Sequence, residues 1–191
     1  MPPVLWAYGL ALEGRRGAAL AVLGAVVGAV RCDVAAVAIP LGLAWCFLGT
    51  DRCSLVRVAA PCTVLGGGLA IALSVAADSR LWAKPGAAPT WRWPEGEVVL
   101  FNNPVENRSS AWGVMPRHWY VASALPRALV GALPLALLGA AADAKCRRFV
   151  VGPAAASVAL LSLLPHKELR FAFPALPLLT LGAAVGAARL W

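Results

Sequence analysis

Residues Val58–Ala77 have the sequence VAAPCTVLGGGLAIALSVAA, which contains no charged side chain. Twenty apolar residues in an α-helix are long enough to cross the hydrocarbon core of a membrane, which is about 30 Å thick. Phe149–Pro165 and Phe171–Ala188 are also free of charge, and Trp119–Ala142 contains a single ion, Arg127. These runs predict helices that span a membrane.

The composition of the whole chain favours the same class of protein. Hydrophobic residues make up 60% of the 191 positions and charged residues 14%, and the mean hydropathy is +0.73. Soluble domains are about half apolar and about one quarter charged. Inside a membrane, a helix satisfies its own backbone polar groups. We therefore predict an all-α, polytopic membrane protein with about 6–7 apolar helices.

The positions of the charged residues divide the chain into three parts. The first apolar run covers only nine residues, Val4–Leu12, which is too short to span as a helix. We therefore expect that the chain begins and ends inside a longer protein. The predicted parts are N-terminal membrane helices in residues 1–77, one long polar loop in residues 78–118, and C-terminal membrane helices in residues 119–191.

The basic residues of the short loops predict the orientation of the chain. Cytoplasmic loops carry an excess of Lys and Arg. If the runs alternate in direction, one side of the membrane receives Arg31, Lys167 and Arg170. The other side, which we expect to be cytoplasmic, receives Arg15, Arg16, Arg52, Arg57, Lys145, Arg147, Arg148 and Arg189. The loop 78–118 and the segment around Lys167 then both face the lumen.

The net charge of +8 and the five cysteines exclude several other classes of function. A basic protein that binds nucleic acid is expected to carry a recognition helix or a basic run with interleaved aromatic residues, and neither is present. The cysteines have no CxxC or His-paired spacing, so we expect no metal site. The positive charge is better explained by cytoplasmic loops and by contacts with a phosphorylated lipid.

Residues Pro165–Pro174, with the sequence PHKELRFAFP, place four ionisable side chains between two apolar runs. Ions near membrane depth are costly unless they are paired or face a polar cavity. Helical spacing predicts His166 and Arg170 on one face, with Lys167 beside them and Glu168 as a partner. Such a cluster suits an anionic lipid head group. A solvated turn between two helices explains the same residues equally well.

The loop 78–118 is the second candidate site, because it interleaves aromatic rings with carboxylates and amides. Trp93, Glu95 and Asn107 are typical of a sugar-binding surface. The alternative is an aromatic belt at the membrane interface. Asn107 also begins an N-glycosylation pattern, Asn107-Arg108-Ser109. Arg127 either extends to the lumenal boundary or points inward at a phosphate.

Several of these stretches resemble one protein family. The sequence SLLPHKELRF of Ser162–Phe171 is similar to the His-Lys-Glu-x-Arg-Phe signature of glycosyltransferase family 22, whose members are membrane mannosyltransferases that use dolichyl-phosphate mannose in the endoplasmic reticulum. Further stretches resemble the members that form an α-1,6 linkage on a dolichyl-pyrophosphate-linked oligosaccharide for N-glycosylation. In order, these are Trp93–Gly96, Phe101-Asn102, Asn107–Ser110, Trp112-Gly113, Trp119-Tyr120 and Ser123–Arg127.

The resemblance implies a multi-pass fold of the GT-C kind in the endoplasmic reticulum membrane, with lumenal chemistry and no cofactor. The sugar transfers with inversion from the lipid-linked donor to the lipid-linked acceptor. In such enzymes a carboxylate of the first lumenal loop is the base, and no stretch here matches that loop, so we expect the catalytic base outside this chain. The implied donor-phosphate residues are His166, Lys167, Arg170 and Arg127, and the implied acceptor residues are Trp93, Glu95 and Asn107.

Two other functions remain open from the sequence. A sister enzyme of the same family, which adds α-1,2-linked mannose or builds a glycosylphosphatidylinositol anchor, shares the His-Lys-Glu signature. A non-enzymatic membrane protein is the second alternative. The stretch Trp93–Gly113 favours the α-1,6 enzyme over both. The oligomeric state is not indicated by any pattern in the sequence.

Overall fold

The computed structural model describes residues 2–48, 52–83, 90–101 and 108–191, and every regular element in these residues is helical. The predicted all-α class is therefore confirmed. The elements are α1 (Pro2–Leu12), α2 (Arg16–Ala29), η1 (Cys32–Val34), α3 (Ala35–Leu48), α4 (Arg52–Leu81), α5 (Pro94–Phe101), η2 (Arg108–Trp112), η3 (Tyr120–Ala124), α6 (Leu125–Leu129), α7 (Ala132–Ala142), α8 (Ala144–Cys146), η4 (Arg147–Val151), α9 (Gly152–Ser162), α10 (Leu169–Ala172) and α11 (Leu176–Ala187).

One helix in the described part of the chain is long and apolar enough to cross a membrane by itself. It is the stretch Arg57–Leu81 of α4. The pair Tyr120–Leu129 and Ala132–Ala142 meets the same standard only if the two bent helices count as a single span. The other apolar helices, among them α1, α2 and α11, are shorter. Length and composition alone therefore give one or two spans.

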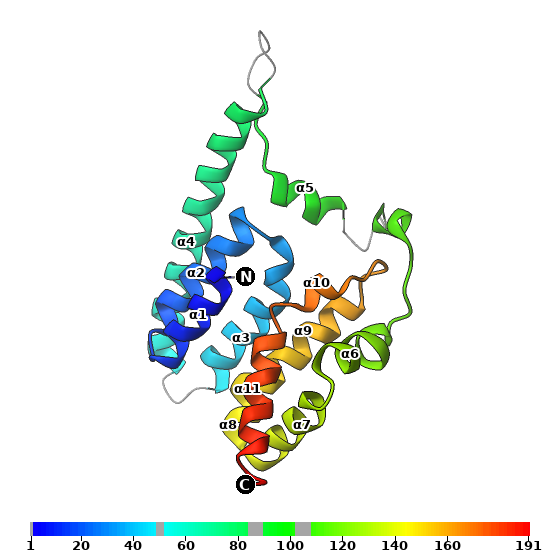
Figure 1. Cartoon of the computed structure of the whole chain (residues 1–191). Coiled ribbons are helices and arrows are strands. Elements are labelled where there is room, and N and C mark those ends of the chain that lie inside the picture. The colour runs from blue at the N-terminus through cyan, green and yellow to red at the C-terminus, as the bar shows by residue number, and fades with distance from the viewer. Residues whose placement is uncertain (1, 49–51, 84–89, 102–107) are drawn as a thin grey trace.

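The helices form two bundles that pack against each other (Figure 1). In the N-terminal bundle α2 packs against both α1 and α4, and in the C-terminal bundle α7 packs against α11. The main contact between the bundles is that of α3 with α9. The Tyr8 hydroxyl adds a second link, because it donates a hydrogen bond of 2.6 Å to the carbonyl of Pro174.

Glycines allow the helix pairs within each bundle to approach closely. On α7, Gly139 lies against Gly182 and Gly186 of α11, and a Cβ atom at Gly186 would overlap the carbonyl oxygen of Leu135. Gly182 and Gly186 are four residues apart, the spacing that brings small residues to one face in packed membrane helices. Gly24 of α2 also lies close to the backbone of α4, where a Cβ atom would be 2.9 Å from the carbonyl oxygen of Thr63.

The predicted apolar run Trp119–Ala142 contains a sharp break where a continuous helix was expected. Its two parts meet at 103°, and Val130 between them has φ of +47°. Pro134 explains the position of the break, because a proline ring conflicts with the carbonyl four residues earlier, here that of Val130. A proline inside a helix also lacks the N–H that this carbonyl requires.

The long direction of the molecule in Figure 1 separates segments that the loop charges assign to opposite sides of a membrane. Helix α8 and the C-terminus lie at the lower end, and the turn between α1 and α2 lies in the lower half. Helix α5 lies in the upper half, and α10 lies above α9 and α11. Arg189, which follows α11, and Asp143, which precedes α8, form an ion pair of 3.8 Å. The orientation of the chain in a membrane stays a prediction.

We expect Gly186→Ala to destabilise the C-terminal bundle, because the added methyl group would force α7 and α11 apart. Overpacking of this kind costs about 1–3 kcal/mol. Thermal unfolding of the purified chain in detergent measures the effect. Gly68→Ala is the matched control, since a Cβ atom there meets no neighbour within 4 Å. Equal melting temperatures for the two variants would contradict this packing.

Candidate functional site

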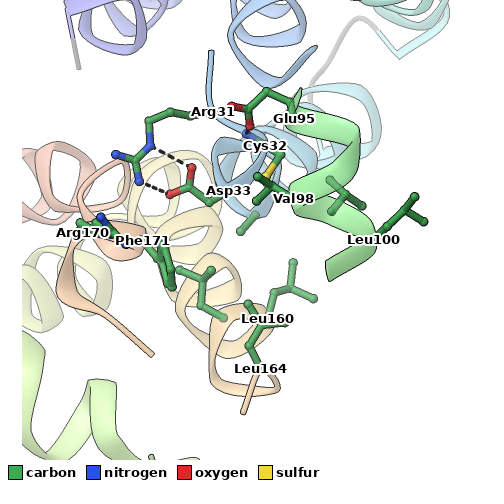
Figure 2. Close-up of a pocket in the computed structure, with 13 residues that line it drawn as sticks. Arg31, Cys32, Asp33, Glu95, Val98, Leu100, Leu160, Leu164, Arg170 and Phe171 are labelled. Carbon is green, nitrogen blue, oxygen red and sulfur yellow. Dashed lines mark hydrogen bonds and ion pairs between the residues drawn. The ribbon is translucent and has the colours of Figure 1, made fainter. Parts of the chain in front are cut away.

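A pocket of about 660 Å³ lies between the two bundles, with η1, α3 and α5 on one side and α9 and α10 on the other (Figure 2). One end is polar and is lined by Arg31, Asp33, Glu95 and Arg170. The remaining walls are mostly apolar and are formed by Ala36, Val98, Val99, Leu100, Leu160, Leu161, Leu164 and Phe171, with the Cys32 thiol beside them. The pocket therefore suits a ligand with a polar head and an apolar tail.

On the N-terminal side of the pocket, Arg31 and Asp33 form a two-point ion pair. Arg31 Nε donates to Asp33 Oδ1 at 3.0 Å and Nη2 donates to Oδ2 at 2.6 Å. This geometry fixes the plane of the guanidinium. The pair lies at η1, where the charged residues interrupt two apolar helices. Sequence reasoning assigned no binding role to Arg31, although this interruption was a visible signal.

Glu95 attaches α5 to the same corner of the pocket. Its Oε2 accepts a hydrogen bond of 2.7 Å from the backbone N–H of Cys32. Burial, with a further contribution from Glu95, raises the pKa of the Cys32 thiol to about 12. The thiol is therefore protonated near neutral pH, and thiolate chemistry is not available here. Glu95 thus lines the pocket and also attaches α5 to the segment that contains Cys32.

On the C-terminal side, three hydrogen bonds attach the segment around Lys167 to the loop before η3. Met115 N–H donates to the carbonyl of Pro165 at 3.1 Å, and Lys167 Nζ donates to the carbonyl of Met115 at 3.1 Å. His166 Nδ1 lies 3.2 Å from the carbonyl oxygen of Gly113. Lys167 is only 3% exposed, and its Nζ also donates to Leu164 O. The ammonium group therefore lies between two backbone carbonyls.

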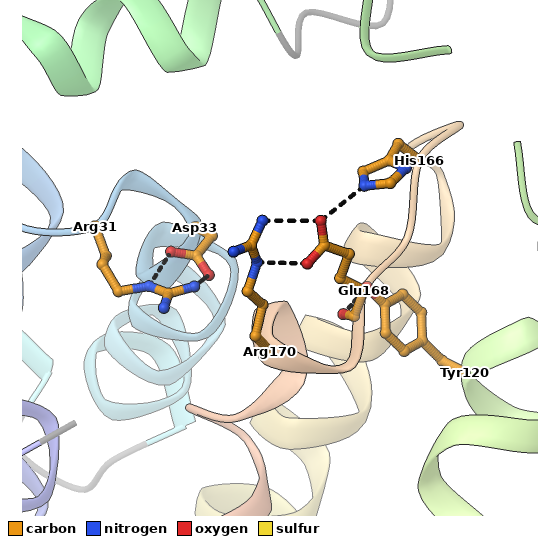
Figure 3. A network of polar contacts seen from close by, with 6 residues as sticks. All are labelled: Arg31, Asp33, Tyr120, His166, Glu168 and Arg170. Carbon is orange, nitrogen blue, oxygen red and sulfur yellow. Dashed lines mark hydrogen bonds and ion pairs between the residues drawn. The ribbon is translucent and has the colours of Figure 1, made fainter. Parts of the chain in front are cut away.

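Glu168 is the centre of a network that holds Arg170 at the pocket (Figure 3). Its Oε1 accepts from Arg170 Nη2 at 2.8 Å and lies 2.9 Å from His166 Nε2. Its Oε2 lies 2.5 Å from Arg170 Nε. The hydroxyl of Tyr120 donates to the backbone carbonyl of Glu168 at 2.9 Å. Arg170 is thus oriented on one side by a carboxylate, as Arg31 is.

The predicted helical arrangement of this segment is wrong. His166 and Lys167 lie in the turn that follows α9, and Glu168 is extended, with φ of −133° and ψ of 148°. Helix α10 begins only at Leu169. His166 and Arg170 nevertheless meet, because both side chains reach Glu168. The prediction that Glu168 is their partner is confirmed.

The hydrogen bond from His166 and the nearby Arg170 lower the pKa of Glu168 below its usual value. The carboxylate is therefore ionised at neutral pH and keeps both partners in place. Each guanidinium uses Nε and one Nη2 hydrogen on its carboxylate, and its other N–H groups make no further hydrogen bond within the part of the chain that the structure describes. Figures 2 and 3 both show Arg170 close to the Arg31–Asp33 pair. The available N–H groups thus come from both bundles.

The other residues that the sequence singled out lie in different places. Trp93 precedes α5 and is not among the residues that line the pocket, and its Nε1 donates to the carbonyl of Gly28 at 2.8 Å. Arg127 is exposed, and its guanidinium donates to Ser123 on the same helical stretch. It is not among the residues that line the pocket. Asn107 lies outside the described residues.

The site can now be compared with known proteins. The model of the Alg9-like mannosyltransferase family matches residues 6–191. The chain belongs to this family. This match covers the Arg31–Asp33 pair, α5 and the segment from His166 to Arg170, so the whole pocket lies within the region that defines the Alg9-like family. No solved structure matches the chain.

Relatives in this family act on lipid-linked sugars according to their names. The "Dol-P-Man:Man(7)GlcNAc(2)-PP-Dol alpha-1,6-mannosyltransferase" of Arabidopsis thaliana is 41% identical over 97% of this chain. The protein of the same name from Saccharomyces cerevisiae is 32% identical over 97%. "GPI alpha-1,2-mannosyltransferase 3" of Danio rerio is 30% identical over 65%. The chain spans 35%, 32% and 22% of the lengths of these proteins.

We expect Lys167→Met to release the loop before η3, because the carbonyls of Met115 and Leu164 lose their shared donor. These acceptors are partly buried, and leaving a fully buried acceptor unsatisfied costs about 1–3 kcal/mol. Trypsin cleavage after the exposed Arg117 measures the release and should become about tenfold faster. Lys145→Met, which removes an exposed lysine at the other end, should not change this rate. An unchanged rate in Lys167→Met would mean that the ammonium does not hold the loop.

The lowered pKa of Glu168 predicts how the segment responds to acid. Its carboxylate stabilises the folded segment fully above the ordinary glutamate value near 4.5, and this stabilisation is lost as the pH falls through the lowered value. Hydrogen exchange of residues 163–171, corrected for intrinsic rates, should therefore stay slow at mildly acidic pH and increase below it.

Glu168→Gln should exchange fast already at neutral pH, with no further step in acid. Glu13→Gln, an exposed carboxylate at the far end of the structure, should behave as the unmodified chain does. A protected segment in Glu168→Gln would show that the carboxylate is not what orders it.

Proposed function

We propose that this chain is part of a mannosyltransferase that moves mannose from dolichyl-phosphate mannose to a dolichyl-pyrophosphate-linked oligosaccharide and forms an α-1,6 linkage. The names of the relatives that match 97% of the chain support this reaction. The observation that carries the proposal is the pocket itself, which combines two oriented guanidinium groups with apolar walls. A lipid phosphate has both of these chemical features.

The donor phosphate is held at the polar end by Arg170 and Arg31. Their free N–H groups suit phosphate oxygens, which arginine binds at two points. His166 contacts the same carboxylate as Arg170, that of Glu168, and adds a third basic side chain to the network. As the glycosidic bond breaks, negative charge gathers on the departing lipid phosphate, and donors fixed in advance stabilise it. The base that activates the acceptor hydroxyl is not assigned to any residue of this chain.

Lys167 acts on this site indirectly. The sequence suggested a direct contact with phosphate, but its ammonium group is buried and donates to two backbone carbonyls. We assign it as a positioning residue, because it fixes the turn from which His166 and Glu168 project. Arg127 as a phosphate ligand and Asn107 as an acceptor ligand stay predictions.

The acceptor oligosaccharide approaches along α5. Trp93 and Glu95 lie at the start of this helix, and Glu95 lines the pocket. An indole ring beside a carboxylate offers a sugar both a stacking surface and a hydroxyl partner. The chain is embedded as a multi-pass GT-C-like protein of the endoplasmic reticulum membrane, with α5 and α10 at the lumenal end and α8 at the cytoplasmic end.

A second member of the same family is the other candidate function. The Danio rerio relative named as a GPI mannosyltransferase is about as similar in identity as the yeast relative, at 30% against 32%. Its match covers 65% of this chain, against 97% for the yeast relative. The α-1,6 reaction is therefore the better supported of the two.

A chimaera tests the proposed reaction. This chain replaces the matching region of the Saccharomyces cerevisiae relative, in cells that lack their own copy. The chimaera should restore conversion of the substrate named for that relative, Man(7)GlcNAc(2)-PP-Dol. Arg170→Ala should lower the conversion about a hundredfold, because it removes a fixed donor at the leaving phosphate. Chromatography of the released oligosaccharides measures the product.

Arg15→Ala, which removes an exposed arginine at the opposite end, is the control and should leave conversion unchanged. Full conversion by a well-expressed Arg170→Ala chimaera would exclude Arg170 from the site. If the unsubstituted chimaera restores growth of a GPI-anchor mutant but not the α-1,6 product, the second candidate is correct.

A further inference from the structure

A second apolar cavity lies next to the pocket, on the side toward α8. It has a volume of about 1060 Å³ and lies between α3 and the stretch formed by η4 and α9. Leu160 lines both this cavity and the polar pocket. The two cavities therefore adjoin along α9.

The walls of both cavities are continuous faces of the same two helices. On the α3 side, Asp33 and Ala36 line the pocket, and Pro40, Leu43 and Phe47 line the second cavity. Steps of three and four residues keep side chains on one face of a helix. On α9, the corresponding positions in the second cavity are Pro153, Ala156, Ala159, Leu160 and Leu163.

The second cavity is open at its side and long. Leu43, Phe47 and Leu163 are 52%, 58% and 61% exposed. The wall from Arg147 to Leu163 is about 24 Å long at 1.5 Å per residue, close to the thickness of a hydrocarbon core. We name this open cavity between α3 and α9 the α3–α9 groove.

The geometry points to the α3–α9 groove as the binding site for the isoprenoid chain of the lipid donor. The inference rests on the proposed function, because it requires the phosphate to lie at Arg31 and Arg170. A volume of 660 Å³ is typical for one small ligand. The sugar, the phosphate and the first part of the chain fill the polar pocket, and the rest of a long chain must leave it. Leu160 lines both cavities, so the chain would pass from one to the other beside it.

A membrane phospholipid is the competing occupant of the groove. Arg147 and Arg148 line the end that is far from the pocket, and both are exposed. They suit an acidic head group there, with its acyl chains in the groove. The shared residue Leu160 and the continuous helix faces favour a ligand that enters from the polar pocket instead.

Binding of two phosphate probes tests the inference. Dolichyl phosphate carries the long chain, and citronellyl phosphate carries the same head on a short one. We expect Ala156→Trp, which fills the groove from an exposed position, to weaken dolichyl phosphate binding about tenfold, equivalent to losing burial of about two methylene groups. Citronellyl phosphate binding should not change. Native mass spectrometry of the full chain in detergent measures both affinities.

Ala155→Trp is the matched control, because Ala155 is exposed on the same helix and does not line the groove. This variant should bind both probes with the same affinity as the unmodified chain. Leu43→Trp fills the groove from α3 and replaces Ala156→Trp if that variant does not fold. The thermal unfolding of each variant shows whether it is folded.

The outcomes separate this inference from the proposed function. If Arg170→Ala weakens both probes while Ala156→Trp weakens neither, the head site stands and the groove is not the chain site. If the unmodified chain binds neither probe, the proposed head site fails as well. If Ala156→Trp weakens only phosphatidic acid, and Arg147→Ala does the same, the groove binds phospholipid and the inference is overturned.

Discussion

The contact of α3 with α9 determines where every group of the candidate site lies. Each helix has a charged segment at one of its ends. Helix α3 begins after the Arg31–Asp33 pair, and α9 ends before the turn that holds Glu168. The two helices run in opposite directions, so these charged ends come together at one end of the contact. Neither bundle contains the complete pocket. A change in the α3–α9 packing would separate Arg31 from Arg170.

The signature segment contributes to the site in two physically different ways. Lys167 and His166 attach it to the loop at Gly113 and Met115, while Glu168 orients Arg170. A buried ammonium group is stable only if its donors are satisfied, and the two carbonyls provide this. One short sequence therefore contains both the anchor and the binding group, and loss of function on mutation does not by itself distinguish the two roles.

The helices were predictable from the sequence because charge-free runs bounded by ions leave the backbone few alternatives. The run Val34–Gly49 corresponds to α3 within one residue at each end. The break at Val130 was not predicted, although Pro134 marks its position, because hydropathy does not register backbone sterics. The site was predicted in part: Glu168 and Arg170 were paired correctly, but the inward turn of Lys167 depends on the loop at Met115, which is distant in sequence.

The charges at the polar end bear on how the proposed lipid phosphate would be held there. Arg31 is balanced by Asp33 and Arg170 by Glu168, and Glu95 adds a further carboxylate. Even with His166 protonated, these groups carry no excess of positive charge. Net attraction therefore contributes little, and the guanidinium groups provide direction through their hydrogen bonds. For the proposed ligand, the affinity would then come mainly from apolar contact with the lipid chain. A site of this design would also release the proposed product phosphate readily, because no uncompensated cation retains it.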